Sequence, residues 1–195
     1  MFVYTITQKD LSDLFNVNIY DYYFAGVTDK EACGANGPLN DRKFKDMFVK
    51  AFGGEKNLEN TYVNAGILLF NLKKMREDKL VEKLLGCASK YNFNRHDQDT
   101  LNYVCNDKIQ NIDKIFNCHP GIIKSLENQV IIHYMCQKPW NYYNMKCANI
   151  WWNYAKLTGL EKEIKEKFPD KSKIKKNRQS KNCSAEKQRK IKKVA

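Results

Sequence analysis

Several features of exported and membrane-embedded chains are missing from this sequence. It has 7 cysteines but no Cys-x-x-Cys pair, and an odd number of scattered cysteines favours reduced thiols in a cytosolic compartment over a disulfide framework. No cationic segment leads into an apolar run at the N-terminus, so the start does not resemble a signal peptide. No apolar run approaches the roughly 20 residues that cross a bilayer. We therefore expect a cytoplasmic chain, either soluble or peripheral.

The positive charge is concentrated at one end of the chain. Residues 171–195 hold eleven Lys or Arg and a single acid, Glu186, out of totals of 34 and 22, so residues 1–170 carry 23 basic and 21 acidic side chains. The last 25 residues have few apolar side chains, which predicts a disordered or helical basic tail. Because no aromatic residues are interleaved, we expect no specific nucleic-acid partner. Contact with an anionic membrane and a merely solvated tail are the alternatives.

Strands and helices alternate along the rest of the chain. Strands are predicted at residues 2–7, 22–27, 62–69 and 129–134. Helices are predicted at residues 10–15, from Pro38 and Asn40 to Gly53-Gly54, on an inner face of Leu80, Val81, Leu84, Leu85 and Ala88, and from near Asp97, where Leu101, Val104 and Cys105 are buried. Strands that are apolar on both faces and alternate with helices favour an α/β fold with a parallel or mixed sheet.

Asn64-Ala-Gly66 is a step of small residues within a strand-like segment. Such a step lets a ligand approach the backbone closely, and an adjacent amide side chain can both donate and accept hydrogen bonds with sugar hydroxyls. A bulge in a packed strand is the simpler explanation of the tripeptide taken by itself.

His96-Asp-Gln-Asp99 places two acids and an amide at the start of a predicted helix. Carboxylates there are stabilised by exposed backbone N–H groups and the helix dipole, so helix capping is the simpler reading. Cys118, His119, His133 and Cys136 could be considered as zinc ligands. Adjacent Cys and His residues are poor geometry for one tetrahedral ion, which disfavours that reading.

Three blocks taken in order carry a resemblance. They are Tyr62-Val-Asn-Ala-Gly-Ile-Leu-Leu-Phe-Asn-Leu72, then Asp97-Gln-Asp-Thr-Leu-Asn102, then His133-Tyr-Met-Cys-Gln-Lys-Pro-Trp140. Together they resemble the C-terminal half of glycosyltransferase family 8, the retaining sugar-nucleotide transferases that build bacterial lipopolysaccharide and related glycans. The resemblance implies an α/β, GT-A-like mixed sheet flanked by helices, with the N-terminal nucleotide-binding half missing. Residues 1–158 would form the truncated domain and residues 159–195 a basic extension.

The resemblance also implies roles for individual residues. Asp29, Asn64, Ala65 and Asp97 would contact the donor sugar, Lys138 the diphosphate, and His133 would ligate Mn²⁺ or Mg²⁺. Gln98 would lie beside the anomeric carbon. Retaining glycosidases use a carboxylate nucleophile, but none is evident in this family, so the expected mechanism is front-face transfer in which Gln98 stabilises positive charge.

Two departures from the family pattern bear on the metal and the leaving group. Alignment on Asp10-Leu-Ser-Asp-Leu14 puts Phe2 and Tyr4 where the metal-binding Asp-x-Asp is expected. Neither side chain supplies the oxygen ligands that these cations prefer, so this chain lacks those ligands. The family usually reads His-x-x-Gly-x-x-Lys-Pro-Trp, whereas here one residue is deleted and Cys136 or Gln137 replaces the glycine.

The expected function is transfer of a hexose from a UDP-sugar to a lipopolysaccharide or other glycan acceptor. The alternative is a catalytically inactive, truncated remnant that only binds a partner or a membrane. Members of this family often carry basic and aromatic C-termini, so Trp151, Trp152 and the tail would hold the protein at the inner face of the cytoplasmic membrane.

Overall fold

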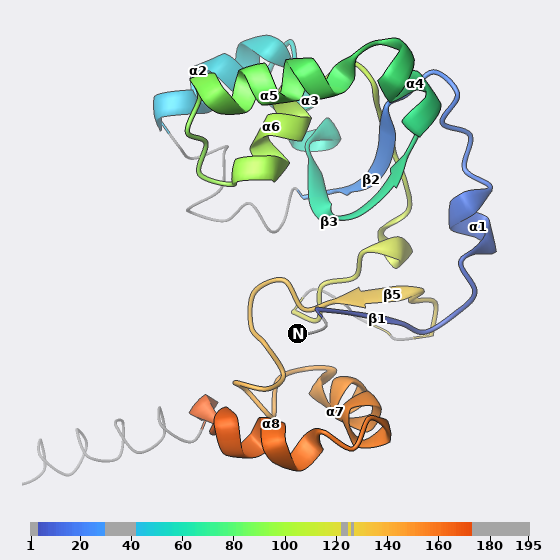
Figure 1. Cartoon of the computed structure of the whole chain (residues 1–195), viewed down its shortest axis with the longest axis vertical. Helices are drawn as coiled ribbons and strands as arrows, with labels where there is room; N and C mark the ends of the chain where they lie inside the picture. The colour runs from blue at the N-terminus through green and yellow to red at the C-terminus, as the bar shows by residue number, and fades with distance from the viewer. Residues whose placement is uncertain (1–3, 30–41, 122–124, 126, 173–195) are drawn as a thin grey trace, which may run out of the picture. The chain divides into compact units, whose positions relative to one another are not determined.

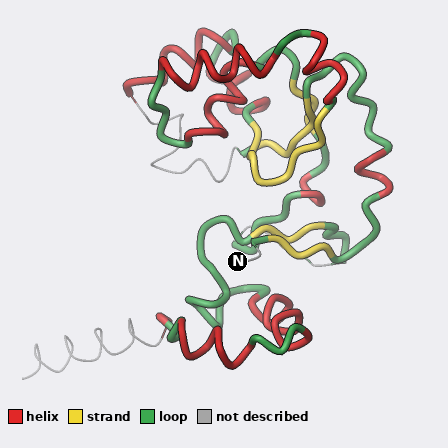
Figure 2. The backbone as a smooth tube through the Cα atoms, viewed as in Figure 1, coloured by secondary structure: helices red, strands yellow, loops and turns green. Residues whose placement is uncertain are grey.

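The computed structural model describes residues 4–29, 42–121, 125 and 127–172, apart from the side chain of Arg42. The chain forms two compact units, which we treat separately. The central unit comprises Thr7–Cys118 and Ser125–Ile131, and the terminal unit comprises Met1–Ile6, His119–Lys124 and Ile132–Ala195. Figure 2 shows the helices, strands and loops of both.

A mixed three-stranded sheet organises the central unit. Its order is β3 (Val63–Phe70), β2 (Phe24–Thr28), β4 (Ile109–Asn111). Strand β2 runs antiparallel to β3 and parallel to β4. The middle strand, Phe-Ala-Gly-Val-Thr, is buried on both faces apart from its last residue, as expected of an interior strand. The expected mixed α/β sheet is therefore confirmed, whereas β4 was not predicted.

Strand β3 contains a wide irregularity where it passes β2. Phe24, Ala25 and Gly26 pair in regular register with Phe70, Leu69 and Leu68, but Thr28 pairs with Val63. Two steps along β2 therefore correspond to five steps along β3. The excess lies in Asn64–Ile67, so the Asn64-Ala-Gly66 step is a bulge in the sheet. Bulges re-aim side chains and interrupt the ladder of backbone hydrogen bonds.

The helical segments of the central unit are α1 (Ser12–Phe15), α2 (Arg42–Ala51), α3 (Glu55–Thr61), α4 (Leu72–Glu77), α5 (Leu80–Lys90), α6 (His96–Val104) and the 3₁₀ turn η1 (Lys114–Phe116). Figure 1 shows α2, α3, α5 and α6 grouped together next to the sheet. Helix α2 presents Phe44 and Phe48 to a core shared with Leu58, Tyr62 and Phe93. Gly53 and Gly54 follow α2 with φ of 70° and 135°, in the region that favours glycine. Pro38 and Asn40 lie outside the described residues.

The predicted inner face of α5 is partly wrong. Leu80 and Cys87 are buried and Leu84 is half-buried, whereas Val81 and Leu85 are 57% and 66% exposed and Ala88 is also exposed. The face that packs inward therefore follows Leu80, Leu84 and Cys87, at spacings of four and three residues. Apolar residues occupy more of this helix than its buried face requires.

The terminal unit combines a short strand pair with two helices. Strand β1 (Thr5–Thr7) pairs with β5 (Ile131–His133), and the chain continues through α7 (Ala148–Leu157) and α8 (Glu161–Lys167). Trp151 lies in an aromatic cluster with Trp140 and Trp152, at ring-centroid distances of 5.1 and 5.0 Å. The range predicted as a basic extension thus begins with a helix, and its residues from 173 onward lie outside the described part.

Candidate functional site

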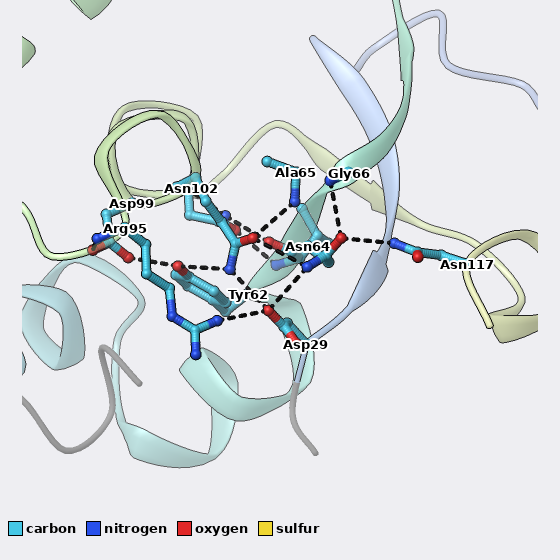
Figure 3. A network of polar contacts seen from close by, with 11 residues as sticks. Asp29, Tyr62, Asn64, Ala65, Gly66, Arg95, Asp99, Asn102 and Asn117 are labelled. Carbon is cyan, nitrogen blue, oxygen red and sulfur yellow. Dashed lines mark hydrogen bonds and ion pairs between the residues drawn. The ribbon is translucent and has the colours of Figure 1, made fainter. Parts of the chain in front are cut away.

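The bulge in β3 leaves two backbone N–H groups that are bound by side chains. Ala65 N–H donates to Gln98 Oε1 at 3.0 Å, and Gly66 N–H donates to Asn64 Oδ1 at 2.9 Å. Figure 3 shows Asn64, Ala65 and Gly66 next to Asn102 of helix α6. An interrupted ladder exposes backbone donors that need new partners, and here amide side chains supply them. The irregular strand is therefore joined to α6 through side-chain hydrogen bonds.

The carboxamide of Gln98 is held by contacts on both of its atoms. Its Oε1 also accepts from Asn64 Nδ2 at 3.2 Å. Its Nε2 donates to Asp29 Oδ2 at 2.8 Å and to the Tyr62 hydroxyl at 3.2 Å. Because each amide atom has two partners of the required type, the orientation of the group is determined by its surroundings. Gln98 is buried, so the site contains a fixed amide dipole.

Asp29 is the charged centre of this network. Its carboxylate is buried, with the residue 3% exposed. Oδ2 accepts from Arg95 Nη1 at 2.9 Å, from Gln98 Nε2, and from Asn64 Nδ2 at 3.3 Å. Oδ1 is buried and has no hydrogen-bond partner among the described residues. A buried acceptor of this kind has an open position for a donor.

Helix α6 is attached to β3 by Asn102, which is completely buried. Asn102 Oδ1 accepts from Val63 N–H, and its Nδ2 donates to Val63 O and to Gln98 O, each at 2.8 Å. Asn117 Nδ2 donates to Asn64 Oδ1 at 2.9 Å. These amides fix the positions of the residues that carry the network.

Asp97 and Asp99 have different surroundings although both lie in the first turn of α6. Asp99 is buried and accepts from the Tyr62 hydroxyl at 2.5 Å and from Arg95 N–H at 2.9 Å. Asp97 is exposed. His96 precedes them with φ of 38°, a strained conformation for a residue other than glycine. The strain is therefore stored next to the two predicted catalytic residues, Asp97 and Gln98.

His133 and Lys138 belong to the terminal unit. Burial, followed by the charges of Lys138 and His119, lowers the pKa of His133 to about 4, so its imidazole is neutral at pH 7. Lys138 Nζ donates to the carbonyl oxygens of Tyr134 and Met135 and lies 4.1 Å from the centroid of the Tyr4 ring. Burial lowers the pKa of Lys138. Two carbonyls and an aromatic face already surround this ammonium group.

The described residues do not form a divalent-metal site by themselves. Among them, no three His, Cys, Asp or Glu side chains are grouped as a metal ion would require. After burial, the charges of Lys138 and His119 both act to lower the pKa of His133, and Mn²⁺ and Mg²⁺ prefer oxygen ligands. The described residues alone therefore do not supply a ligand set for the predicted ion, and His133 as a metal ligand stays a prediction.

The structure thus brings four of the predicted site residues into direct contact: Asp29, Asn64, Ala65 and Gln98. Sequence reasoning missed several other members of the network, namely Tyr62, Arg95, Asn102 and Asn117. Tyr62 and Asn102 stand inside motif blocks already identified, and their presence there was a usable signal. No sequence signal pointed to Arg95 or Asn117.

Comparisons with known proteins show which proteins this chain is similar to. The sequence model of glycosyl transferase family 8 matches residues 5–144. A putative glycosyltransferase of Haemophilus influenzae is 31% identical over 157 residues, which span 75% of this chain and 43% of that protein. The chain spans between about a fifth and two fifths of the length of the curated relatives it matches.

Solved structures show the same fold. The apo structure of the bifunctional glycosyltransferase WbbM superposes with a TM-score of 0.68 at 21% identity, over 84% of this chain and 33% of that one. The galactosyltransferase LgtC, solved with donor and acceptor sugar analogs, gives 0.53 at 20% identity, over 70% and 52% of the two chains. The expected GT-A-like fold is confirmed.

Proposed function

The chain belongs to glycosyltransferase family 8, and from this premise we propose that it carries the sugar-binding part of an enzyme that transfers a hexose from a UDP-sugar, with retention, to a lipopolysaccharide or other glycan acceptor. The observation that supports this most directly is the buried network of Asp29, Asn64 and Gln98 at the bulge of β3. Sugars are recognised by carboxylate and amide groups that accept and donate hydrogen bonds to hydroxyls. A fixed cluster of such groups suits a hexose.

The proposed roles are those that the family resemblance implies. Asn64, Ala65, Asp29 and Asp97 bind the hexose. Gln98 presents its fixed amide dipole to the positive charge that develops at the anomeric carbon, and fixed dipoles stabilise such charge without reorganisation. Lys138 meets the departing diphosphate, for which its ammonium group would have to exchange the contacts with Tyr134 O and Met135 O.

The predicted metal ion stays separate from these roles. Within the family it would polarise the diphosphate, with His133 as the expected ligand in this chain. Because no three His, Cys, Asp or Glu side chains are grouped for a metal ion among the described residues, no step of the proposed reaction is assigned to it.

Calorimetric titration of the 195-residue chain tests the proposal. UDP-glucose and UDP-galactose should bind saturably, and at least one should bind more tightly than UDP because Asp29 and Asn64 add contacts to the hexose. Asn64→Ala should remove that difference, whereas Arg76→Gln, at an exposed position in α4, should preserve it. Failure of a folded chain to bind either sugar nucleotide would contradict the proposal. Binding that requires Mn²⁺ would show that the predicted ion takes part in it.

One observation favours the alternative function, a membrane-binding module. The terminal unit has an apolar hollow of about 480 Å³ between α7 and α8, lined by residues that include Trp151, Tyr154, Leu157 and Phe168. Leu157 is 84% exposed. Exposed apolar groups that are followed in the sequence by a basic segment are typical of contact with an anionic membrane surface. No helix in the described part of the chain is long and apolar enough to span a bilayer.

Vesicle sedimentation tests this alternative. The chain should sediment with phosphatidylglycerol vesicles and much less with phosphatidylcholine vesicles, and Leu157→Asp should reduce sedimentation. Leu85→Asp is the matched control, because Leu85 is also exposed but lies on the central unit. Equal behaviour of the two variants would count against the hollow as the contact surface.

A further inference from the structure

Asp29 and Arg95 form a partly buried ion pair at the centre of the candidate sugar site. Nη1 of Arg95 lies 2.9 Å from Asp29 Oδ2, and the two side chains are 25% and 1% exposed. Figure 3 shows the arginine side chain extending from the α6 side to the carboxylate. Pairs of this kind are screened less by salt than surface pairs and have more defined geometry.

All the described contacts to the carboxylate of Asp29 are made on one oxygen. Arg95, Gln98 and Asn64 all donate to Oδ2. Oδ1 is equally buried and has no partner within the described ranges. An ionised carboxylate only accepts hydrogen bonds, so the open position on Oδ1 suits a hydroxyl donor and disfavours a second carboxylate.

The backbone of Arg95 is held in turn by the helix that carries Gln98. Its N–H donates to Asp99 Oδ2 at 2.9 Å, and Asp99 Oδ1 accepts from the Tyr62 hydroxyl. The same hydroxyl accepts from Gln98 Nε2. Arg95 and Gln98 are therefore linked through Asp99 and Tyr62, and they meet again at Asp29 Oδ2.

We propose that Arg95 is a positioning residue that holds Asp29 so that its Oδ1 accepts one hydroxyl of a neutral hexose, and that this arrangement selects against a uronic acid whose carboxylate would face Oδ1. The inference rests on the proposed function. Arg95 itself does not touch the reacting atoms. Its side chain fixes Oδ2, and that constraint determines the direction of Oδ1.

The first test uses the free protein and needs no sugar. Hydrogen exchange at the Ala65 amide reports on the Gln98 contact, since Ala65 N–H donates to Gln98 Oε1. Arg95→Gln should accelerate this exchange about tenfold, equivalent to about 1.4 kcal/mol, while Arg76→Gln leaves it unchanged. Lysine can replace one donor, so Arg95→Lys should restore part of the protection. Unchanged exchange in Arg95→Gln would overturn the positioning role.

The second test separates sugar recognition from nucleotide binding. Arg95→Gln should weaken UDP-glucose or UDP-galactose about tenfold and leave UDP within about twofold, and the wild-type chain should bind UDP-glucuronic acid more weakly than UDP-glucose. Equal weakening of UDP and UDP-hexose would indicate general damage and overturn the inference, as would tight UDP-glucuronic acid binding. If the wild-type chain binds no nucleotide at all, the proposed function and the sugar selection fail together, whereas the exchange experiment still decides whether Arg95 positions the network.

Discussion

Gly26 and Leu68 face each other across strands β2 and β3, so closely that a Cβ on Gly26 would lie 2.9 Å from Leu68 Cδ2. The same Cβ would lie 3.1 Å from Val63 Cβ. This pair is the last in regular register before the bulge. The absence of a side chain at Gly26 therefore lets the two strands meet where the register changes.

Gly26→Ala should destabilise the protein by about 1–3 kcal/mol, because the added methyl group overpacks a buried contact. Gly86→Ala is the matched control: a Cβ there meets nothing within 4 Å, and the residue lies within helix α5. That variant should gain about 0.5–1 kcal/mol from helix propensity. Denaturant unfolding of both variants measures the difference, and the same sign for both would contradict the packing argument.

Asn102→Leu should be among the most damaging substitutions in α6. It removes three hydrogen bonds and leaves the buried N–H and C=O of Val63 without their side-chain partner. Each buried group left unpaired costs about 1–3 kcal/mol. Asn106→Leu removes one bond, to Ala51 O, at a partly buried site, and should cost about 1 kcal/mol. Urea titrations measure the free energy of unfolding of both variants. A similar decrease in Asn102→Leu and Asn106→Leu would show that Asn102 does not hold α6 against β3.

Lys138→Met should lower the free energy of unfolding by about 1–2 kcal/mol, because two backbone carbonyls lose a charged donor and Tyr4 loses a cation contact. Lys156→Met, at an exposed position in α7, should change stability by less than about 0.5 kcal/mol. Titration of the folded variants with UDP then shows whether Lys138 also binds diphosphate. If Lys138→Met lost UDP binding with an unchanged free energy of unfolding, the lysine would serve to bind the ligand and would not stabilise the fold.

Alkylation should distinguish the described cysteines. Cys136 is exposed, whereas Cys105 is buried. Burial, with a smaller contribution from Asp107, raises the pKa of the Cys105 thiol to about 12. Because the thiolate is the reactive form, iodoacetamide at pH 8 should modify Cys136 in the native protein and Cys105 only after unfolding. Peptide mass spectrometry measures both, and early labelling of Cys105 would show that its surroundings open in solution.

Patterns of several residues were predictable from the sequence, whereas pairings between distant segments were not. The two buried strands and the helix of Asp97 were found because apolar runs and short motifs are local signals. The contact between Asp29 and Arg95 joins residues 66 positions apart and depends on how the start of α6 lies relative to the end of β2. Strand β4 has three residues, too few for a periodic pattern. Val81 and Leu85 look like core residues because hydrophobicity alone does not specify which side of a helix packs inward.

For the site residues too, the local motifs were predictable and the contacts between distant segments were not. Asn64, Ala65 and Gln98 were identified through motif blocks, and the structure places them in hydrogen-bond contact. The simpler reading of Asn64-Ala-Gly66 as a bulge is also correct. The bulge releases the N–H groups that Gln98 and Asn64 bind, whereas contact of this step with a donor sugar stays a prediction.

The mismatch between β2 and β3 also bears on how the chain tolerates changes in length. Between Gly26 and Thr28, β3 has three residues more than a regular ladder would need. A variant that lacks Ala65–Ile67 could continue the regular pairing through Thr28 and keep an ordinary antiparallel strand pair. It would have lost the backbone groups that bind Gln98 and Asn64. Folding and the proposed sugar recognition should therefore be separable by one short deletion, and a homologous strand pair without this excess would keep the scaffold and lose the proposed site.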